Sequence, residues 1–415
     1  MGLIVPKLPS ALVVLDEPFY QKSGHILCPV NWWRFGDHLA AHFDKLTLFV
    51  PMSDGPCPAN AQPVKVKHLK ICGRFFFRRN EDYYSRIWTK RRQLLATARE
   101  IFSEHELIIL RTPLPAALLL ARLAWNMDKP TMLFVSTNIL TAISYADVRG
   151  LKAKVARLFA RRLRKMELTI ARQSKMVAAW GEELLPIYRR TNPQTILAAA
   201  PILSKEHMCE RQDTCSDPTV RIIRVAEILP NKGLGYLLKA VAELRRRGRD
   251  IKLDVAGGTN QPAYQEELLT LARDLDIAEH VKFHGQVEFG PVLFDLYSHS
   301  DIHVISSISE GLPRCIVEGR AFGLPTIATN VGGIPTVVQH KKNGILINPR
   351  DPEQIVQAVE LIMDDSSLRQ KIIQEGYKLA RLETAEFQAE RLAGLMAKAL
   401  KGQPLGEAAN DLHLI

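Results

Sequence analysis

The chain has 415 residues, of which 47% are hydrophobic and 24% are charged, and its formal net charge is +11. This is enough apolar sequence for two domains with separate cores. No apolar run approaches the roughly 20 residues that a membrane-spanning helix needs, so the composition excludes such a helix.

The amino terminus and the cysteines both indicate a cytoplasmic protein. The first ten residues place Lys7 between prolines and lack a hydrophobic core region, so we expect no signal peptide. No Cys-x2-Cys spacing occurs among the six cysteines, which are Cys28, Cys57, Cys72, Cys209, Cys215 and Cys315. We therefore expect reduced thiols, and neither a disulfide framework nor a zinc site.

The positive charge is concentrated in the first half of the chain. Residues 1–200 contain 30 Lys and Arg against 15 Asp and Glu, a net +15, whereas residues 201–415 contain 25 against 29, a net −4. This asymmetry predicts an anionic partner for the first half: a membrane surface, a nucleic acid or an acidic acceptor.

In chain order, short apolar runs predict six strands in the first half, at residues 11–16, 46–50, 107–110, 131–135, 175–180 and 195–200. Helical periodicity predicts helices over residues 115–126 and 151–172. The loop Tyr20–His25 follows the first strand, where a first βα turn meets a ligand in an open α/β sheet.

Two segments of the first half combine basic and apolar residues. Arg74–Arg92 interleaves arginine with aromatic residues, which suits a lipid headgroup layer or stacking on single-stranded nucleic acid. A helix with its aromatic side chains turned inward explains the same pattern. In Leu151–Arg172 the apolar stripe favours a core seam over a membrane face.

The polar stretch Ser204–Pro218 is predicted to be a linker with the interdomain cleft beside it. Strand and helix then alternate about every 30 residues, which predicts a parallel sheet with helices on both faces. The predicted strands are residues 220–228, 251–256, 281–283, 301–306, 326–329 and 345–347. Closing helices are predicted at residues 353–363, 368–379 and 385–400.

A short helix between two of these strands carries two carboxylates. The segment begins Ser309-Glu310-Gly311-Leu312-Pro313, which suits a sharp turn and a helix start, and Glu318 follows eight residues after Glu310. Along a helix that spacing is roughly 12 Å, which is longer than the roughly 5 to 9.5 Å of a hydrolytic pair. The two carboxylates are therefore interpreted as anchors for separate parts of one ligand; the alternative for an isolated pair is two solvated charges on a helix.

Glu-x7-Glu with Gly-Leu-Pro after the first Glu resembles the donor-site signature of retaining glycosyltransferases of family 4, which have the GT-B fold. Pro230–Gly233, Val255–Gly258 and Val331–Pro335 are similar to further family motifs in order and spacing. Together these motifs cover about residues 220–350.

The resemblance implies an α/β protein with two Rossmann-like parallel-sheet domains that face a central cleft. In chain order, we expect an acceptor-side domain over 1–203, the linker 204–218, a nucleotide-sugar-binding domain over 219–384, a helix over 385–401 that returns to the first domain, and a tail over 402–415.

The same resemblance implies roles for individual residues. Lys232 would bind the donor phosphates, Glu310 and the backbone of Gly311, Leu312 and Pro313 would hold the donor sugar, and Glu318 would accept hydrogen bonds from the ribose. The remaining candidates for substrate binding are Gly24, Gly257, Gly285 and Arg314. Transfer would retain anomeric configuration without an enzyme nucleophile, and no metal or cofactor is expected besides the donor.

One position departs from the family pattern. The family has Gly-Arg before the Pro-x-Lys-Gly element, and this chain has Ala226-Glu227. A carboxylate there would repel a diphosphate unless a neighbour such as Arg224 or Arg314 compensates. This substitution supports an alternative, a non-catalytic nucleotide-sugar-binding paralogue that assists a partner enzyme.

Other classes lack their motifs. Gly257-Gly258-Thr259-Asn260 is not the Gly-x-Gly-x-x-Gly of a dinucleotide site, and no P-loop occurs. Asp274 and Asp276 fall in a predicted helix and are interpreted as solvated charges, not metal ligands. The expected partners are a UDP- or GDP-sugar, a saccharide or lipid-linked acceptor of polysaccharide biosynthesis and an anionic membrane surface that the protein meets peripherally, with no nucleic acid.

Overall fold

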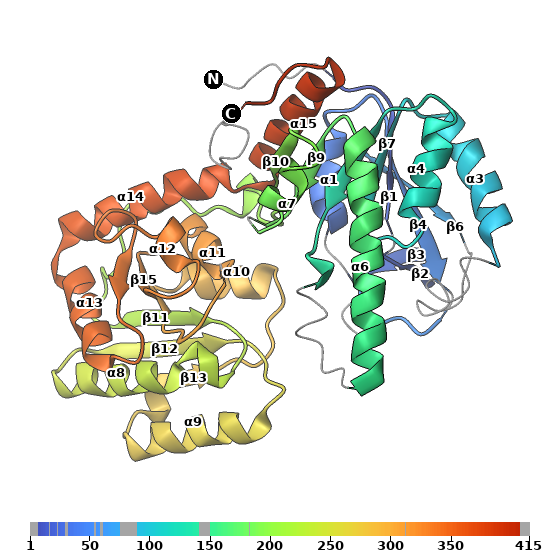
Figure 1. The fold of residues 1–415 in the computed structure, drawn as a ribbon. Coiled ribbons are helices and arrows are strands. Elements are labelled where there is room, and N and C mark those ends of the chain that lie inside the picture. The colour runs from blue at the N-terminus through green and yellow to red at the C-terminus, as the bar shows by residue number, and fades with distance from the viewer. Residues whose placement is uncertain are drawn as a thin grey trace. The chain divides into compact units, whose positions relative to one another are not determined.

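The computed structural model describes residues 7–15, 17–22, 24–29, 32–53, 55–58, 61–74, 89–140, 150–181, 183–311 and 313–406, except for the side chains of residues 150–153. The chain divides into two compact units (Figure 1). Unit 1 consists of Met1–Ile202 together with Thr384–Ile415, and unit 2 is Leu203–Glu383.

Unit 1 is built on a sheet of ten strands among its described residues, in the order β10-β9-β8-β7-β1-β4-β2-β3-β5, with β6 also paired to β4. The strands are β1 (Ala11–Val14), β2 (Phe19–Lys22), β3 (His25–Cys28), β4 (Leu46–Ser53), β5 (Gln62–Pro63), β6 (Leu69–Arg74), β7 (Leu107–Thr112), β8 (Thr131–Val135), β9 (Val177–Ala179) and β10 (Thr195–Leu197). From β10 to β4 all pairs are parallel. The six strands predicted in this half are confirmed.

Helices cover both faces of this sheet, because alternate residues of the buried strands point to opposite sides. In β1, Ala11 and Val13 join one core and Leu12 and Val14 join the other. The first core is closed by α1 (Trp32–Ala40) and α15 (Ala385–Leu400), which pack on each other. The second core is covered by α3 (Arg91–Ser103), α4 (Ala117–Trp125), α6 (Gly150–Gln173) and α7 (Leu185–Arg189).

A β-hairpin occupies the place where the sequence predicted a loop. Strands β2 and β3 are antiparallel, with Lys22 opposite His25 and Gly24 in the turn, and β2 pairs with β4 at the edge of the parallel core. Both strands are four residues long and half exposed. Their apolar pattern is therefore too short to distinguish a strand from a loop by periodicity.

Unit 2 contains a parallel sheet in the order β13-β12-β11-β14-β15-β16. Its strands are β11 (Val220–Val225), β12 (Ile251–Ala256), β13 (Val281–Phe283), β14 (Ile302–Ile305), β15 (Thr326–Thr329) and β16 (Ile345–Ile347). The chain builds outward from β11 to β13, then returns to pair β14 with β11. The strand order therefore reverses between β11 and β14, which is where open α/β sheets bind their ligands.

The helices of unit 2 lie on both faces of this sheet. The face with Ile222, Leu253 and Val304 packs against α8 (Leu234–Arg246), α9 (Pro262–Asp274) and α13 (Pro352–Asp364). On the other face lie α10 (Pro291–Ser298), α11 (Cys315–Ala321) and α12 (Ile334–Val337), and α14 (Ser366–Leu382) packs on α11.

Residues 204–218, predicted from composition as a linker, are part of unit 2 in the structure. Arg211 donates to the carbonyls of Ser298 and Ser300, and the backbone N–H of Cys215 donates to Asp301. Asp213 pairs with Arg369 of α14. These bonds fasten the segment to the second sheet and its helices.

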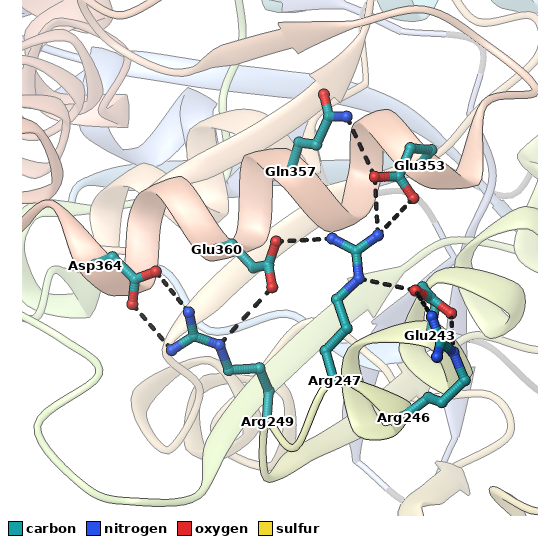
Figure 2. Close-up of polar contacts among 8 residues, drawn as sticks. All are labelled: Glu243, Arg246, Arg247, Arg249, Glu353, Gln357, Glu360 and Asp364. Carbon is teal, nitrogen blue, oxygen red and sulfur yellow. Dashed lines mark hydrogen bonds and ion pairs between the residues drawn. The ribbon is translucent and has the colours of Figure 1, made fainter.

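An ion-pair network joins α8 to α13 on the surface of unit 2 (Figure 2). Arg247, the C-cap residue of α8, pairs with Glu243 of that helix and with Glu353 and Glu360 of α13. Arg249 pairs with Glu360 and Asp364, as Figure 2 shows. The shared arginines connect four carboxylates from two helices into one network.

This network predicts a dependence of stability on pH. Hydrogen bonds from Arg246 and Arg247 lower the pKa of Glu243 from 4.5 to about 2. Because the folded-state pKa is the lower one, Glu243 stabilises the fold fully above its ordinary pKa, and this contribution is lost as the pH falls toward 2. We expect Glu243→Gln to lower the urea midpoint more at pH 7 than at pH 4, with an effect that salt reduces. Glu279→Gln, at an exposed carboxylate, is the control; an equal drop for Glu243→Gln at both pH values would contradict the prediction.

Candidate functional site

Two of the predicted site residues meet where the strand order of unit 2 reverses. Lys232 ends the short 3-10 helix after β11, and Glu310 lies in the loop after β14. The Lys232 Nζ atom lies 2.8 Å from Oε1 and 2.7 Å from Oε2 of Glu310. Both side chains are largely buried, with exposed fractions of 17% and 13%. The result is a charge pair at the carboxyl ends of the two central strands.

Close backbone packing holds the two loops together. Gly233 follows Lys232 with a φ of 66°, and a Cβ atom there would lie 2.0 Å from the carbonyl oxygen of Ser306. The Ser306 hydroxyl donates to the Lys232 carbonyl at 3.0 Å, and the N–H of Ile308 donates to the Asn231 carbonyl at 2.7 Å. Only glycine fits at position 233, and this explains the Lys-Gly pair in the sequence.

A third loop, after β15, supports the backbone of Glu310. Gly332 has a φ of 56°, and a Cβ atom there would lie 1.7 Å from the Glu310 carbonyl oxygen. The N–H of Gly333 donates to the Gly311 carbonyl at 3.0 Å. The two glycines of the Val331–Pro335 motif thus allow this loop to lie directly against the backbone of the turn at Glu310.

The side chain of Glu310 has a second partner, which the sequence did not predict. The Ser307 hydroxyl donates to Glu310 Oε2 at 2.9 Å, and Arg224 of β11 donates to the same hydroxyl at 2.8 Å. Arg224 and Ser307 are both buried, with exposed fractions of 1% and 0%. Ser307 could have been suspected as a polar residue at the end of a buried strand, three positions before Glu310.

Glu318 lies in different surroundings from Glu310. It belongs to α11, and its Oε2 accepts a hydrogen bond of 2.9 Å from the hydroxyl of Tyr297. Burial raises the pKa of Glu318, while the Tyr297 hydrogen bond and the charge of Arg314 act in the opposite direction. Burial also raises the pKa of Tyr297, so this phenol stays protonated and donates. Tyr297 comes from α10, and no motif in the sequence pointed to it.

The remaining candidates are distributed over both units. The Gly257 N–H donates to the Gly285 carbonyl at 2.8 Å, which joins the ends of β12 and β13. Gly311 and Pro313 form the turn before α11, where Arg314 is an exposed N-cap residue. Gly24 lies in the hairpin turn of unit 1. Leu312 lies outside the residues that the structure describes.

The side chain of Glu227, the departure from the family pattern, is exposed just beyond β11. Of the two arginines considered as compensation, Arg314 is exposed at the N-cap of α11, whereas Arg224 lies beneath the site and reaches Glu310 through Ser307. Within the described residues, no group of three or more His, Cys, Asp or Glu side chains is placed to hold a metal ion.

Comparison with known proteins gives matches to both the sequence and the fold. Residues 211–379 match the family model for glycosyl transferases group 1. An uncharacterized glycosyltransferase of Haemophilus influenzae is 31% identical over 168 residues, which are 39% of this chain and 46% of that protein. The GDP-mannose-dependent alpha-(1-6)-phosphatidylinositol monomannoside mannosyltransferase of Mycobacterium tuberculosis is 31% identical over 196 residues, 45% of this chain and 48% of that protein. The chain thus spans less than half the length of these relatives.

Solved structures match over nearly the whole chain. Anabaena Alr3699/HepE in complex with UDP has a TM-score of 0.63 at 14% identity and covers 94% of this chain and 100% of its own. Sucrose-phosphate synthase from Thermosynechococcus elongatus has a TM-score of 0.59 at 15% identity and covers 95% and 100%. At such identities the likeness concerns the fold alone. It confirms the predicted fold class, an α/β chain with two parallel-sheet domains of the GT-B type.

Proposed function

We propose, on the premise that residues 211–379 belong to the glycosyl transferases group 1 family, that this protein is a retaining glycosyltransferase. It moves a sugar from a nucleoside-diphosphate sugar to an acceptor. The observation that carries this proposal is the Lys232–Glu310 pair at the point where the strand order of unit 2 reverses. An ammonium and a carboxylate at strand tips match the two charged parts of the reaction: a leaving diphosphate and a sugar that becomes cationic.

Each residue then has a distinct part in binding the donor. Lys232 contributes its charge to the diphosphate, which requires it to leave Glu310 when the donor enters. Glu310 accepts hydrogen bonds from the donor sugar beside the turn at Gly311 and Pro313. Glu318, with Tyr297 on one of its oxygens, accepts from the ribose. The leaving diphosphate takes the acceptor proton on the face of the sugar from which it departs, and configuration is retained.

Thermal-shift screening against UDP-glucose, GDP-mannose and related nucleotide sugars tests this proposal. A ligand at 100 times its Kd stabilises the folded state by about 2.7 kcal/mol, so a true donor will raise the melting temperature. UDP is bound in the Anabaena structure, and GDP-mannose appears in the name of the mycobacterial relative. Failure of every nucleotide sugar to stabilise the protein would contradict the proposal.

Glu227 favours a second candidate, a nucleotide-sugar-binding protein without turnover of its own. Its exposed carboxylate lies beyond β11, close in sequence to Lys232, and would oppose a diphosphate. Both candidates predict donor binding, so the discriminating measurement is release of nucleoside diphosphate from the stabilising donor. Release above the buffer rate supports the enzyme, and binding without release supports the second candidate.

For the acceptor side, we propose that unit 1 meets an anionic membrane surface and a lipid-linked or cell-surface saccharide. The amino-terminal half of α6 exposes three apolar side chains, Val155 (61%), Leu158 (69%) and Phe159 (42%), at helical spacing. Exposed basic residues flank them: Lys154, Arg157, Arg161 and Arg162. The sequence favoured packing of this apolar stripe against the protein core. The structure corrects that expectation for the amino-terminal half of α6, because the first buried side chains among the described residues of the helix are those of Ala160 and Leu163.

Basic and apolar groups on one helix suit peripheral attachment to an anionic bilayer. Within the described residues, no helix has both the length and the apolar composition required to cross a membrane. The other segment considered for this role is Arg74–Arg92, of which residues 75–88 lie outside the described part of the chain.

We expect the protein to bind vesicles that contain phosphatidylserine and to bind neutral vesicles weakly. Each Lys or Arg near an anionic surface contributes roughly 1 kcal/mol. Reversing Arg157, Arg161 and Arg162 to Glu will therefore weaken co-sedimentation strongly and leave donor-induced stabilisation unchanged. The control reverses three exposed lysines of unit 2: Lys239, Lys282 and Lys342. Equal binding to neutral and anionic vesicles, or equal losses in the two triple variants, would argue against this surface.

A further inference from the structure

Arg224 is a buried cation in the sheet of unit 2 without a direct anionic partner. Its side chain donates from Nη2 to the Ser307 hydroxyl at 2.8 Å and from Nη1 to the Val225 carbonyl at 3.2 Å. The buried Nε has no hydrogen-bond partner among the described residues. Among the described residues, no carboxylate forms an ion pair with Arg224. A buried charge without compensation is strongly disfavoured, so this arginine requires an explanation.

The neighbouring histidine adds no second positive charge. His303 of β14 is fully buried, and burial together with the charges of Arg224 and Arg320 lowers its pKa to about 3. The ring is therefore neutral at pH 7. The negative charge connected to Arg224 by hydrogen bonds is that of Glu310, one serine away.

The direction of the hydrogen bonds through Ser307 is fixed by chemistry. A guanidinium can only donate, so the Ser307 oxygen accepts from Arg224. The one hydroxyl proton is then free for Glu310 Oε2, which lies 2.9 Å away. Thr329 donates to the Ser307 carbonyl at 2.7 Å and holds the backbone of this link in place. Arg224, Ser307 and Glu310 form a polarised chain that ends on the carboxylate.

The hydrogen bonds from Arg224 through Ser307 end on the same carboxylate that Lys232 contacts, and the two come from different parts of the fold. Lys232 contacts both oxygens of Glu310, whereas Ser307 contacts Oε2. The proposed function requires Lys232 to turn to the diphosphate when the donor binds. Of the hydrogen bonds that the described residues donate to the Glu310 carboxylate, the one from Ser307 is then the one that remains.

We propose that Arg224 is a positioning residue for donor-sugar recognition. Through Ser307 it holds the carboxylate of Glu310 in place after Lys232 has moved to the diphosphate. The inference rests on the proposed function and extends it, because it assigns a role in the site to a residue of the sheet interior that touches no substrate.

The test compares binding of a nucleotide sugar with binding of the bare nucleotide. Isothermal titration of UDP-glucose against UDP, and of GDP-mannose against GDP, is performed on the wild type, Arg224→Met, Ser307→Ala and the double variant. We expect each single variant to bind the sugar nucleotide about tenfold more weakly or worse, since a charge-assisted hydrogen bond is lost, with the bare nucleotide unaffected. The double variant should be no weaker than the worse single one, because both act through one chain. Arg224→Lys should recover part of the loss.

Arg369→Met is the matched control. Arg369 is also a buried arginine of unit 2, with 6% exposure, and it pairs with Asp213. The Arg369→Met variant should have a lower melting temperature, but it should not change the Kd of the sugar nucleotide relative to the Kd of the bare nucleotide. If Arg224→Met does not fold, Ser307→Ala decides by the same comparison. Wild-type affinity in Ser307→Ala, or equal losses for sugar nucleotide and nucleotide, would overturn the inference. If the wild type binds no nucleotide sugar at all, the proposed function fails first and the inference fails with it.

Discussion

Replacing Lys232 with alanine should abolish most of the stabilisation that a nucleotide sugar gives. The ammonium lies in the loop after β11, and from a short 3-10 helix it already contacts Glu310. A hydrogen bond to a charged group is worth about 1.5–3 kcal/mol, so Kd should rise by about tenfold to a hundredfold or more. The loss should be similar for sugar nucleotide and bare nucleotide, because the partner is the diphosphate they share.

One control and one second site variant accompany Lys232→Ala. Lys239→Ala removes an exposed lysine from the adjacent helix α8 and should leave the donor Kd unchanged. Glu318→Gln keeps an oxygen for the Tyr297 hydroxyl but removes the charge proposed for the ribose, and it should weaken donor binding as well. If Lys232→Ala and Glu318→Gln both bind the donor like the wild type, the assignment of the site is wrong.

Glu310→Gln should separate turnover from nucleotide binding. Both carboxylate oxygens of Glu310 contact Lys232 in the structure. Removing the carboxylate charge frees the ammonium, so bare UDP or GDP should bind as well as before or more tightly. The sugar loses its charged acceptor, so the rate of transfer should fall on the order of tenfold or more.

Steady-state kinetics with the stabilising donor and titration with the bare nucleotide check the two halves of this prediction. Glu267→Gln, at an exposed carboxylate of α9, is the control for a charge change elsewhere in unit 2. A Glu310→Gln protein that turns over normally would remove this residue from the site. Weaker nucleotide binding would instead show that the ion pair with Lys232 does not compete with the diphosphate.

Much of unit 2 could be predicted from the sequence, because its strands are short apolar runs between glycines and polar turns. Strands β12, β13, β15 and β16 of unit 2 have the bounds that the pattern indicated, as does helix α15 of unit 1. The hairpin β2–β3 could not be recognised, since its strands are short and partly exposed.

Within the site, the motifs located Lys232 and Glu310 but not the bond between them. The two residues are 78 positions apart, and the parallel pairing of β11 with β14 brings them together. Tyr297 and Ser307 were missed for a related reason: each acquires its partner only through packing between elements. Arg224 was considered for its charge alone, because a strand pattern cannot show which way a buried polar side chain is directed.

The closing of unit 1 by α15 has a consequence for how the chain matures. Ala389, Leu392 and Met396 of this helix belong to the first core of unit 1, yet they are translated after all of unit 2. Domains usually fold in the order in which the ribosome releases them. Here the segment made second, residues 203–383, is continuous and can complete its core first. The segment made first must wait for the last helix, with part of its apolar surface uncovered during synthesis. A nascent chain that stalls before residue 384 would therefore present chaperones with an unfinished amino-terminal unit beside a finished carboxyl-terminal one.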